Sequence, residues 1–456
     1  MNKKFILLLL PLVISGCVSL DPKYEKPSGA VSESLPNGGG VYSNLQENTQ
    51  SINWENYIVD EKIKKVIAIS LENNKDLKIA LQNIEAARAQ YGVTDSSKLP
   101  SLSVGANGSK GENLNGQFET FESNVGFNTF EIDFFGRVKS LSTASLESFL
   151  ATKEAQKTTK IAIISETLKN YIELANNKSK LSIAKENYNS AKSSLELIQL
   201  RSENGIGNEI DLSNAQTILY RAEADIFRFN TLIEQNKNAL NVIAGTSISD
   251  SLLPRSLNDL ENSIKNIEIG ISSDVLLNRP DIIQAEHSLK SANANIGAAR
   301  AAFFPRITLT ANGGVASNQL SSLFSGTHGA WIFSPSISIP IFNNGYNQSN
   351  LDYAKAQKEI AILNYEKAIQ TAFREVADEL AQKGTIDEQI AAYNNLFNAS
   401  KRSFDLSQRS YEEGIYNYLE VLTAQRNLYS VQLELLDIKK QKLNNFINLY
   451  KALSIN

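Results

Sequence analysis

The chain of 456 residues carries an internal duplication, and this feature most constrains how the chain can fold. Near the start of each copy, matching residues lie 205 positions apart: Asp76 and Asp281, Gly92 and Gly297, Pro100 and Pro305, Leu102 and Ile307. Later in each copy the separation is 209 positions: Gly136 and Gly345, Gly205 and Gly414, Ile206 and Ile415, Asn208 and Asn417. Because four residues are gained between Leu102 and Gly136, the second copy is expected to contain the longer loop excursion.

Each copy contains two runs in which apolar and small polar residues alternate, which predicts a β-hairpin. In the second copy the apolar positions are Ile307, Leu309, Ala311 and Val315, then Trp331, Phe333, Ile337, Ile339 and Ile341. Proline fits poorly inside a strand ladder, so Pro335 predicts a bulge and Pro340 marks the strand's exit. In the first copy, residues 102–106 and 125–129 alternate in the same way, and the polar segment 108–120 is predicted to be the loop.

Long helices follow each hairpin. The chain has no proline between Arg137 and Pro254, and from about residue 141 to residue 203 apolar residues recur every three or four positions. Such spacing is typical of a coiled-coil seam, and about 60 residues would form a helix about 90 Å long. Gly205 and Gly207 are expected to end this helix, and a second helix is predicted from about Asp211 to residue 244. A shorter helix, capped by Asp60, is predicted before the first hairpin, with a break near residues 73–74.

The amino-terminal residues have the layout of a secretory signal peptide. Lys3 and Lys4 precede an apolar run from Phe5 to Ile14 that is too short to span a membrane. Cys17 is the only cysteine and directly follows Ser15 and Gly16, as in the lipobox at which bacterial lipoproteins are cut and acylated. We therefore expect Cys17 to be the lipidation site. The resemblance to bacterial lipoproteins further implies export to the outer membrane, because Val18 stands where an aspartate would imply retention in the inner membrane.

The composition excludes several classes of protein. A hydrophobic content of 42%, a mean hydropathy of -0.24 and a net charge of -4 fit neither a polytopic helical membrane protein nor a nucleic-acid-binding protein. The only histidines are His287 and His328. One is expected on a helix and the other in a loop, about forty residues away, so we do not expect them to bind a metal together. The sequence also contains no glycine-rich phosphate-binding loop. We expect no enzymatic activity, no catalytic residues, no metal and no cofactor. Pro280 and Asp281 are explained by the start of a helix.

Four strands cannot close on themselves. An open sheet edge in lipid leaves unpaired backbone groups that cost several kcal/mol each, so further copies of the chain must complete the sheet. Two copies would give eight strands and a filled interior, whereas three would give twelve strands and room for a channel. On each strand, the face with small polar side chains fits a water-filled lumen, and the face with apolar side chains fits lipid.

Several segments resemble the outer-membrane efflux channels of the TolC family, in its OprM-like lipoprotein branch. The similar segments are residues 270–282, residues 292–305, Pro340-Ile341-Phe342 with Gly345, Asp133-Phe134-Phe135-Gly136-Arg137, Cys17, and Pro22-Lys23-Tyr24 with Pro27. The resemblance implies a mixed α and β fold in a homotrimer, with a twelve-stranded outer-membrane β-barrel continuous with a long periplasmic α-helical barrel. It also implies an equatorial domain, a periplasmic adaptor and an inner-membrane exporter of the RND type.

On this basis the chain divides into five segments. Residues 1–16 are the signal peptide and residues 17–60 a lipidated extended segment. Residues 61–245 form the first repeat, residues 246–279 an equatorial connection, and residues 280–456 the second repeat. The expected location is the outer membrane, where the protein is lipid-anchored, inserted by its strands and extends into the periplasm.

The two predicted helix turns are the expected surface for the adaptor, because they occupy equivalent positions of the repeat. The residues assigned to this surface are Gly205, Ile206, Asn208, Asp211, Arg409, Gly414, Ile415 and Asn417. An alternative explanation requires no partner, since glycine ends helices and asparagine or aspartate caps them.

The same region is expected to form the gate. Leu419 matches a leucine that constricts the entrance in the OprM-like pattern, but Thr423 stands where that pattern has an aspartate. Glu420 faces elsewhere on the helix and is a weaker substitute for the missing charge. A ring of three leucines could itself exclude hydrated ions. Alternatively, Leu419 belongs to the helix seam that continues to Leu422.

These expectations predict an outer-membrane channel of a tripartite efflux pump that exports drugs or other toxic solutes. A duct of a type I protein secretion system would share the entire fold and is the alternative function. A purely structural coiled-coil lipoprotein would explain the long helices but not the four strands.

Overall fold

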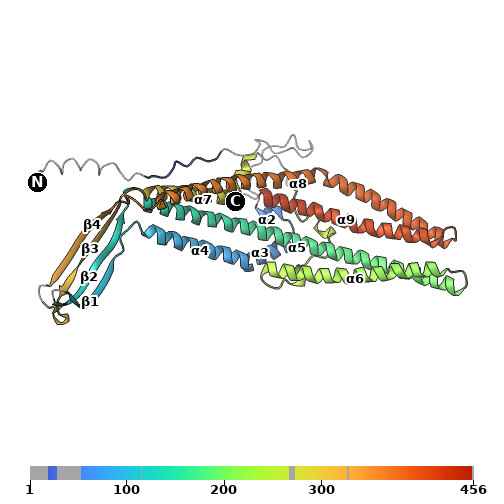
Figure 1. Ribbon diagram of the computed structural model, residues 1–456. Coiled ribbons are helices and arrows are strands. Elements are labelled where there is room, and N and C mark those ends of the chain that lie inside the picture. The colour runs from blue at the N-terminus through green and yellow to red at the C-terminus, as the bar shows by residue number, and fades with distance from the viewer. Residues whose placement is uncertain (1–18, 28–52, 114–115, 267–272, 326–327, 454–456) are drawn as a thin grey trace. The chain divides into compact units, whose positions relative to one another are not determined.

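The computed structural model describes residues 19–27, 53–113, 116–266, 273–325 and 328–453 of the chain (Figure 1). The chain divides into two compact units. The first contains the described parts of residues 1–29, 82–154 and 283–368, and the second those of residues 30–81, 155–282 and 369–456. Each unit therefore combines segments from both copies of the repeat.

The first unit contains a four-stranded antiparallel sheet in the order β1-β2-β3-β4 (Figure 1). The strands are β1 (Ser103–Asn113), β2 (Gly116–Ile132), β3 (Arg306–Ser317) and β4 (Gly329–Ser338). Each copy of the repeat supplies one hairpin, and β2 pairs with β3 to join the copies. The connection between β3 and β4 is the longer one, as the repeat spacing predicts. Within the described chain, β1 and β4 are edge strands.

The predicted loop over residues 108–120 is wrong. β1 and β2 pair continuously from Ser103 opposite Gly126 to Asn113 opposite Gly116, so only two residues separate the strands. The polar composition concealed these strand ends, because neither face carries the alternating apolar residues that identify a half-buried strand. Polar pairs across the ladder accompany the pairing instead: Asn107 donates to Glu122 at 3.0 Å, and Lys110 contacts Glu119.

The predicted bulge at Pro335 is also wrong. The pairing of β3 with β4 is continuous through the Leu309–Pro335 pair, and proline is tolerated there because β4 is an edge strand. The register shift lies in β2 between Phe127 and Phe130, where Thr129 has a φ of 57°. β4 ends at Ser338, so Pro340 follows the strand as predicted, while Ile339 and Ile341 lie beyond it.

The helices of the first unit pack around α7 (Pro280–Ala301). This helix lies against the start of α5 (Arg137–Glu203), where Ser291 donates to the carbonyl of Ala144 at 2.8 Å. On another side, Ile296 and Ala299 pack against Ala354 of α8 (Tyr346–Glu412). The sequence prediction of a helix starting at Pro280 is confirmed.

The second unit contains α2 (Trp54–Tyr57), α3 (Glu61–Asn73), the start of α4 (Lys75–Ser96), and two helical hairpins. The hairpins join the distal part of α5 to α6 (Glu209–Ala244) and that of α8 to α9 (Tyr418–Leu453). Asp60 accepts hydrogen bonds from the amides of Lys62 and Ile63, so the predicted cap is confirmed. Short 3-10 helices, η2 (Asp250–Leu252), η3 (Asn258–Leu260) and η4 (Ser273–Asn278), connect the repeats.

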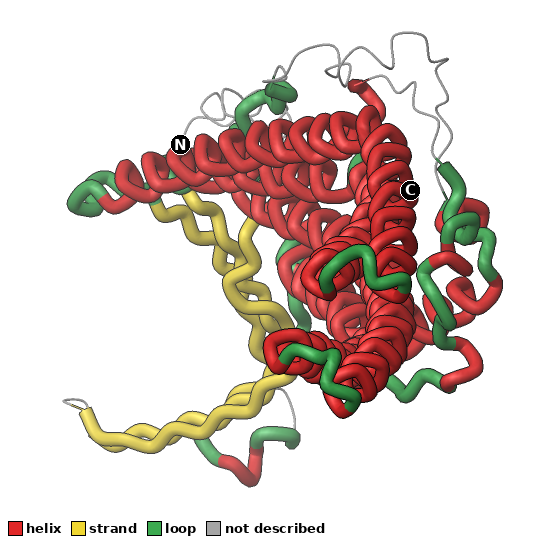
Figure 2. Tube along the Cα trace, turned by 90° about the vertical axis from the view of Figure 1, so that its right-hand side faces the viewer, coloured by secondary structure: helices red, strands yellow, loops and turns green. Residues whose placement is uncertain are grey.

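The two hairpins repeat one another closely. α5 and α8 are each 67 residues long, and α6 and α9 are each 36 residues long. The predicted helices are confirmed, although α5 begins at Arg137 rather than near residue 141 and α6 at Glu209 rather than near Asp211. Figures 1 and 2 show both helix-to-helix turns at the same end of the second unit.

Candidate functional site

Both turns between the helices contain the same pair of backbone hydrogen bonds. The amide of Gly205 donates to the carbonyl of Ser202 and that of Ile206 to Arg201, each at 3.0 Å. At the equivalent positions, Gly414 donates to Tyr411 at 3.0 Å and Ile415 donates to Ser410 at 2.8 Å. The two glycines have φ values of 73° and 77°, which other residues rarely adopt. These are Schellman motifs, and they explain why both helices end at a glycine.

An interhelical core holds the two turns next to each other. Arg201 at the end of α5 donates to the carbonyls of Tyr411 and Glu412, both at 3.3 Å, and its guanidinium lies 4.4 Å from the centre of the Tyr411 ring. Tyr411 in turn contacts Tyr418, and burial raises the pKa of Tyr418 to about 12. A shared apolar cluster continues below these rings and contains Ala191, Leu195, Ile198, Ala215, Ile218, Tyr411, Tyr418, Val421 and Leu422.

The residues predicted to bind the adaptor are brought together at this end of the unit, and most of them are exposed. Ile206 and Ile415 are 80% and 66% exposed, although isoleucine is usually buried. Asn208 caps α6 by accepting the amide of Ile210 at 2.9 Å. The exposed polar residues of this group are Asn208, Arg409 and Asn417, and Asp211 is half-buried.

The predicted gate residues lie in the first turns of α9. Leu419 is 55% exposed, whereas Tyr418 and Leu422 on either side are buried. Leu419 is therefore not part of the apolar seam within the described chain. Thr423 donates its hydroxyl to the carbonyl of Leu419 at 2.9 Å, so its side chain is turned back onto the helix. Glu420 is exposed.

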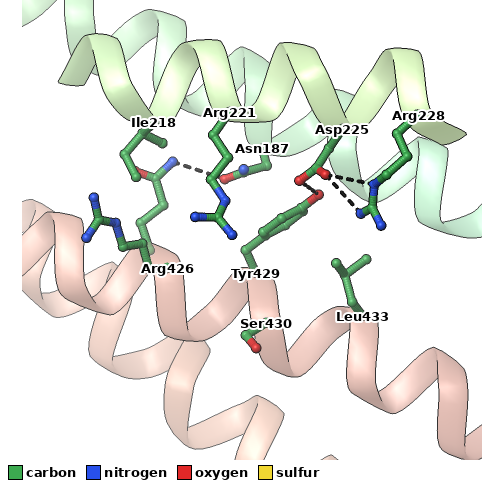
Figure 3. A pocket seen from close by; sticks show the side chains of 10 residues that line it. Asn187, Ile218, Arg221, Asp225, Arg228, Arg426, Tyr429, Ser430 and Leu433 are labelled. Atoms are coloured by element: carbon green, nitrogen blue, oxygen red, sulfur yellow. Dashed lines mark hydrogen bonds and ion pairs between the residues drawn. The ribbon is translucent and has the colours of Figure 1, made fainter. Parts of the chain in front are cut away.

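Further along the hairpins, a basic cavity of about 290 Å³ lies between α6 and α9 (Figure 3). Asp225 accepts hydrogen bonds from Tyr429 and from Arg228, both at 2.9 Å. Burial, together with the hydrogen bond to Asp225, raises the pKa of Tyr429 well above its usual value. These contacts join the two hairpins. The cavity is lined by Asn187, Ile218, Arg221, Asp225, Arg228, Gln425, Arg426, Tyr429, Ser430 and Leu433.

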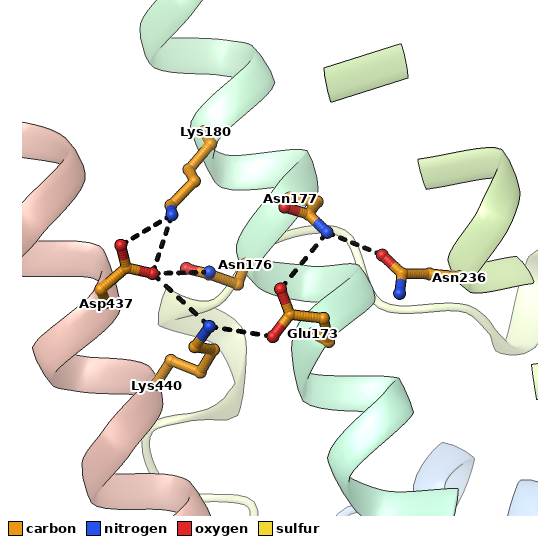
Figure 4. Close-up of polar contacts among 7 residues, drawn as sticks. All are labelled: Glu173, Asn176, Asn177, Lys180, Asn236, Asp437 and Lys440. Carbon is orange, nitrogen blue, oxygen red and sulfur yellow. Dashed lines mark hydrogen bonds and ion pairs between the residues drawn. The ribbon is translucent and has the colours of Figure 1, made fainter. Parts of the chain in front are cut away.

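A second polar contact between hairpins involves Asp437 of α9 (Figure 4). Lys180 of α5 contacts both carboxylate oxygens of Asp437 at 2.8 Å, and Lys440 bridges Glu173 at 2.9 Å and Asp437 at 3.5 Å. Burial alone would raise the pKa of Asp437, but the hydrogen bonds from Lys180 and Asn176 and the charges of both lysines hold it below its usual value. In the sequence, Asn176 is visible only as an interruption in the regular spacing of apolar residues.

Sequence reasoning missed the role of Arg279. This side chain is buried and donates to Asp281 at 2.7 and 3.0 Å, to Glu375 at 2.9 Å, and to the carbonyl of Ala452 at 3.1 Å. It therefore joins the start of α7 to α8 and to the last turn of α9. An arginine directly before Pro280 and Asp281 was the only sequence signal for this contact. It could not be interpreted because Glu375 and Ala452, which Arg279 also contacts, are distant in sequence.

The histidines have structural contacts. His287 Nδ1 lies 2.6 Å from Glu147, and the carbonyl of His328 accepts the amide of Ala316 at 3.0 Å. Among the described residues, no group of histidine, cysteine and acidic side chains is arranged to hold a metal ion. The helices in the described ranges include none that is both long and apolar enough to cross a membrane. Cys17 lies outside the described residues.

Comparison with known proteins identifies the class. A family model described as outer membrane efflux protein matches residues 66–246 and 271–454. The chain is 39% identical over 452 residues to SrpC of Pseudomonas putida, a solvent efflux pump outer membrane protein, covering 97% of this chain and 96% of SrpC. It is 37% identical over 454 residues to the cation efflux system protein CusC of Escherichia coli, covering 99% of this chain and 98% of CusC.

A solved structure agrees with this. The open state of the MtrE outer membrane channel of Neisseria gonorrhoeae superposes with a TM-score of 0.85 at 33% identity, covering 96% of this chain and 98% of MtrE. The chain therefore belongs to the outer membrane efflux protein family. It is an outer-membrane channel protein of an efflux pump, and the sequence-based identification of its family is confirmed.

Proposed function

We propose that three copies of this chain form a closed channel through the outer membrane and that the channel serves a tripartite pump exporting drugs or other toxic solutes. The observation that carries the proposal is the open sheet. β1 and β4 are edge strands in the described chain, and every residue of β4 is exposed. Three copies joined edge to edge would supply the twelve strands of a closed sheet wide enough for a lumen.

The cargo is proposed from the relatives. SrpC is named for solvent efflux and CusC for cation efflux, so related channels serve different substrates. Deleting the gene should sensitise cells to toxic solutes, and restoring it should return resistance. Unchanged susceptibility together with retention of a secreted protein inside the cell would favour the alternative, a type I secretion duct.

We propose that a periplasmic adaptor docks at the two turns and connects the channel to an inner-membrane exporter of the RND type. The exposed Ile206 and Ile415 lie at equivalent positions and are surrounded by the polar residues Asn208, Arg409 and Asn417. Exposed apolar side chains within a polar rim are typical of a protein-binding surface. Changing Ile206 or Ile415 to tryptophan should block resistance while the oligomer still assembles. Resistance that survives both changes would contradict docking at the turns.

We propose that Leu419 forms the narrowest ring of the closed entrance, with Thr423 and Glu420 nearby. An exposed leucine on the first turn of α9, repeated in three copies, would give a dewetted constriction. The matched control is Ile210, the residue 209 positions earlier, which is also exposed. Leu419→Ser should raise single-channel conductance in planar bilayers and Ile210→Ser should not. Equal conductance of the Leu419→Ser and wild-type channels would exclude Leu419 from the gate.

We propose that Cys17 is acylated after removal of residues 1–16 and that residues 17–60 form the lipidated amino-terminal segment. The expected extended conformation does not hold throughout, because residues 54–57 form the short helix α2. The basis is the signal-like sequence ending at the only cysteine. Cys17→Ala should abolish palmitate incorporation while the strands still insert, because they bury apolar surface in lipid independently of the anchor. Palmitate labelling that persists in the variant would refute the assignment. The division into repeats at residues 61–245 and 280–456, with a connection at residues 246–279, belongs to the same proposal.

A further inference from the structure

In the first unit, residues 20–26 run along one stripe of α7 in the opposite direction to the helix. We call residues 20–26 the strap. The contacts proceed in order: Leu20 with Arg300, Asp21 with Gly297, Pro22 with Asn293, Tyr24 with Lys290, and Lys26 with Glu286. The α7 positions are spaced by three and four residues, so they occupy a single face of the helix.

The contacts fix the backbone of the strap as well as its side chains. Arg300 donates to the carbonyl of Leu20 at 3.2 Å, and the buried Asn293 donates to the carbonyl of Pro22 at 2.8 Å. Between these two points, Ser140 of α5 donates to the Asp21 carboxylate at 2.5 Å. Hydrogen bonds to backbone carbonyls hold the chain itself in place, as in other sites that recognise extended peptides.

Gly297 makes room for the strap. A Cβ atom at this position would lie 1.6 Å from Oδ1 of Asp21 and 2.8 Å from the hydroxyl of Ser140. Both distances are shorter than any real contact, so a side chain at residue 297 would displace the Asp21 carboxylate. The glycine therefore creates a slot between α7 and α5 that fits the second residue of the strap.

At the other end, charges and an aromatic ring fasten the strap. Lys26 pairs with Glu286 at 3.2 Å, and Glu286 also pairs with Lys290 at 2.8 Å. The ammonium of Lys290 lies 5.3 Å from the centre of the Tyr24 ring. Burial raises the pKa of Tyr24 well above its usual value, so this phenol stays neutral at any physiological pH.

The strap and the part of α7 that it follows have similar lengths. From residue 286 to residue 300 the helix advances about 21 Å, at 1.5 Å per residue. Six peptide units from Leu20 to Lys26 reach at most about 20 to 22 Å when fully extended. Pro22 also favours an extended backbone at Asp21, the residue before it.

The other copy of the repeat supplies a natural comparison. The positions of α4 equivalent to Asn293, Gly297 and Arg300 are Arg88, Gly92 and Asp95. Nothing in the described chain lies within 4 Å of a Cβ placed on Gly92. Arg88 is paired with Glu85 at 3.2 Å, and an aspartate at position 95 cannot donate to a strap carbonyl. A glycine at this position is therefore not sufficient to bind the strap. The hydrogen bonds donated by Asn293 and Arg300 distinguish the site on α7 from the equivalent surface of α4.

We propose that α7 carries a dedicated binding site for residues 20–26 and that this site fixes the strap, with Leu20 beside the end of α7 that leads into β3. The ligand is an extended segment of the same chain with an aspartate-proline pair, recognised by Arg300, the Gly297 slot and Asn293. The site acts through noncovalent contacts, so it holds Leu20 and the residues after it whether or not Cys17 is acylated.

The first test is limited proteolysis of the full-length protein in detergent. Trypsin cleavage after Lys23 requires the strap to leave α7, and it should be at least tenfold faster in Gly297→Ala than in the wild type. The matched control, Gly92→Ala, should be cleaved at the wild-type rate. A double variant, Asn293→Ala with Arg300→Ala, removes both donors and tests the site without adding a side chain in the slot. Cleavage at the wild-type rate in both α7 variants, or equal acceleration in Gly92→Ala, would overturn the proposal.

The second test separates the strap from the lipid anchor. In a Cys17→Ser background, a spin label attached to Ser19→Cys reports the mobility of the residues next to position 17. The label should be immobilised when Gly297 is present and become mobile with Gly297→Ala. A label that is mobile with Gly297 present would contradict the proposal, because it would show that the acyl group is needed to hold this end. Palmitate incorporation at Cys17 is measured separately, so failure of the lipidation assignment leaves this result interpretable.

Discussion

The two copies of the repeat share a backbone but differ in the side chains that stabilise it. In the second copy, Arg279 donates to the carbonyl of Ala452 near the end of α9. In the first copy, the equivalent residue Asn74 donates to the equivalent carbonyl, that of Ile243 in α6, at 2.8 Å. The equivalent carbonyl groups accept a hydrogen bond from the ion-paired guanidinium of Arg279 in one copy and from the side-chain amide of Asn74 in the other. We call Arg279 with its partners Asp281 and Glu375 the Arg279 clamp.

This difference shows which features specify the repeated fold. The left-handed glycines at the turns and the paired helix lengths are common to both copies, because they determine where each helix ends. Side chains that join helices have diverged, and the second copy has gained Arg279 and the strap site of α7. Substituting equivalent residues in the two copies therefore separates what the backbone requires from what each copy does.

The largest difference is expected at the clamp. Arg279→Ala leaves Asp281 and Glu375 without their shared partner and should cost about 3 kcal/mol, as expected when one member of a buried ion pair is removed. Asn74→Ala should cost about 1 kcal/mol, because it removes a neutral hydrogen bond and the cap on the amide of Leu77. Thermal unfolding in detergent, followed by circular dichroism, measures both. Equal losses would show that the charge of Arg279 is not important.

The second-largest difference between the copies is expected at the helix-to-helix turns. A Cβ on Gly207 would lie 2.4 Å from the Cα of Ser202, so Gly207→Ala must open the first turn. The equivalent residue in the second turn is Tyr416, which is 59% exposed. Gly207→Ala should cost about 1 to 3 kcal/mol of local backbone strain, whereas Tyr416→Ala should stay within about 0.5 kcal/mol of the wild type. Hydrogen exchange of the turn amides reports this local stability. Faster exchange in Tyr416→Ala than in Gly207→Ala would reverse the comparison.

The contact between Tyr429 and Asp225 should have a smaller effect. Tyr429→Phe removes one hydrogen bond between the hairpins, worth about 1 to 2 kcal/mol because its acceptor is charged. The equivalent residue Tyr220 is 60% exposed, so Tyr220→Phe is the matched control. If the channel opens by separation of the hairpins, Tyr429→Phe should increase the time that single channels spend open. No change relative to Tyr220→Phe would mean that this contact does not restrain opening.

The smallest expected effect is a pH dependence specific to the second copy. The pKa of Asp437 is held below its usual value in the folded protein, so its stabilising contribution is complete above about pH 4 and is lost as the pH falls through the lowered pKa. The equivalent residue of the first copy is Arg228. Asp437→Asn should lower the unfolding temperature at pH 7 but match the wild type more closely at pH 3. A constant difference between the two proteins across this range would exclude the ionised carboxylate as the cause.

The sequence was sufficient to predict the elements but not the contacts between them. Alternating residues predicted both hairpins, and glycines at constant spacing predicted both turns, because these signals are local. The ends of β1 and β2 were missed because residues 108–120 are polar on both faces. The bulge was misplaced because proline at a sheet edge needs no bulge, and edge position depends on strand order.

The site was predicted to a similar extent. Residues of the two turns were identified together because the repeat places them at equivalent positions, and the structure brings them to one end of the second unit. The Arg279 clamp and the strap were not predicted, since each joins segments that lie far apart in sequence. For the strap, the residues quoted for the family resemblance included Pro22, Asn293 and Gly297, but nothing local indicates that they meet.

The most direct test of the account is the number of chains in the assembled protein. The two edge strands of the described sheet require partners. Two copies would supply only eight strands, whose interior side chains fill, whereas three copies would supply twelve. Native mass spectrometry of the full-length protein, released from detergent micelles, should therefore show three copies. A stable single copy or a pair in the membrane-extracted protein would contradict the proposed channel.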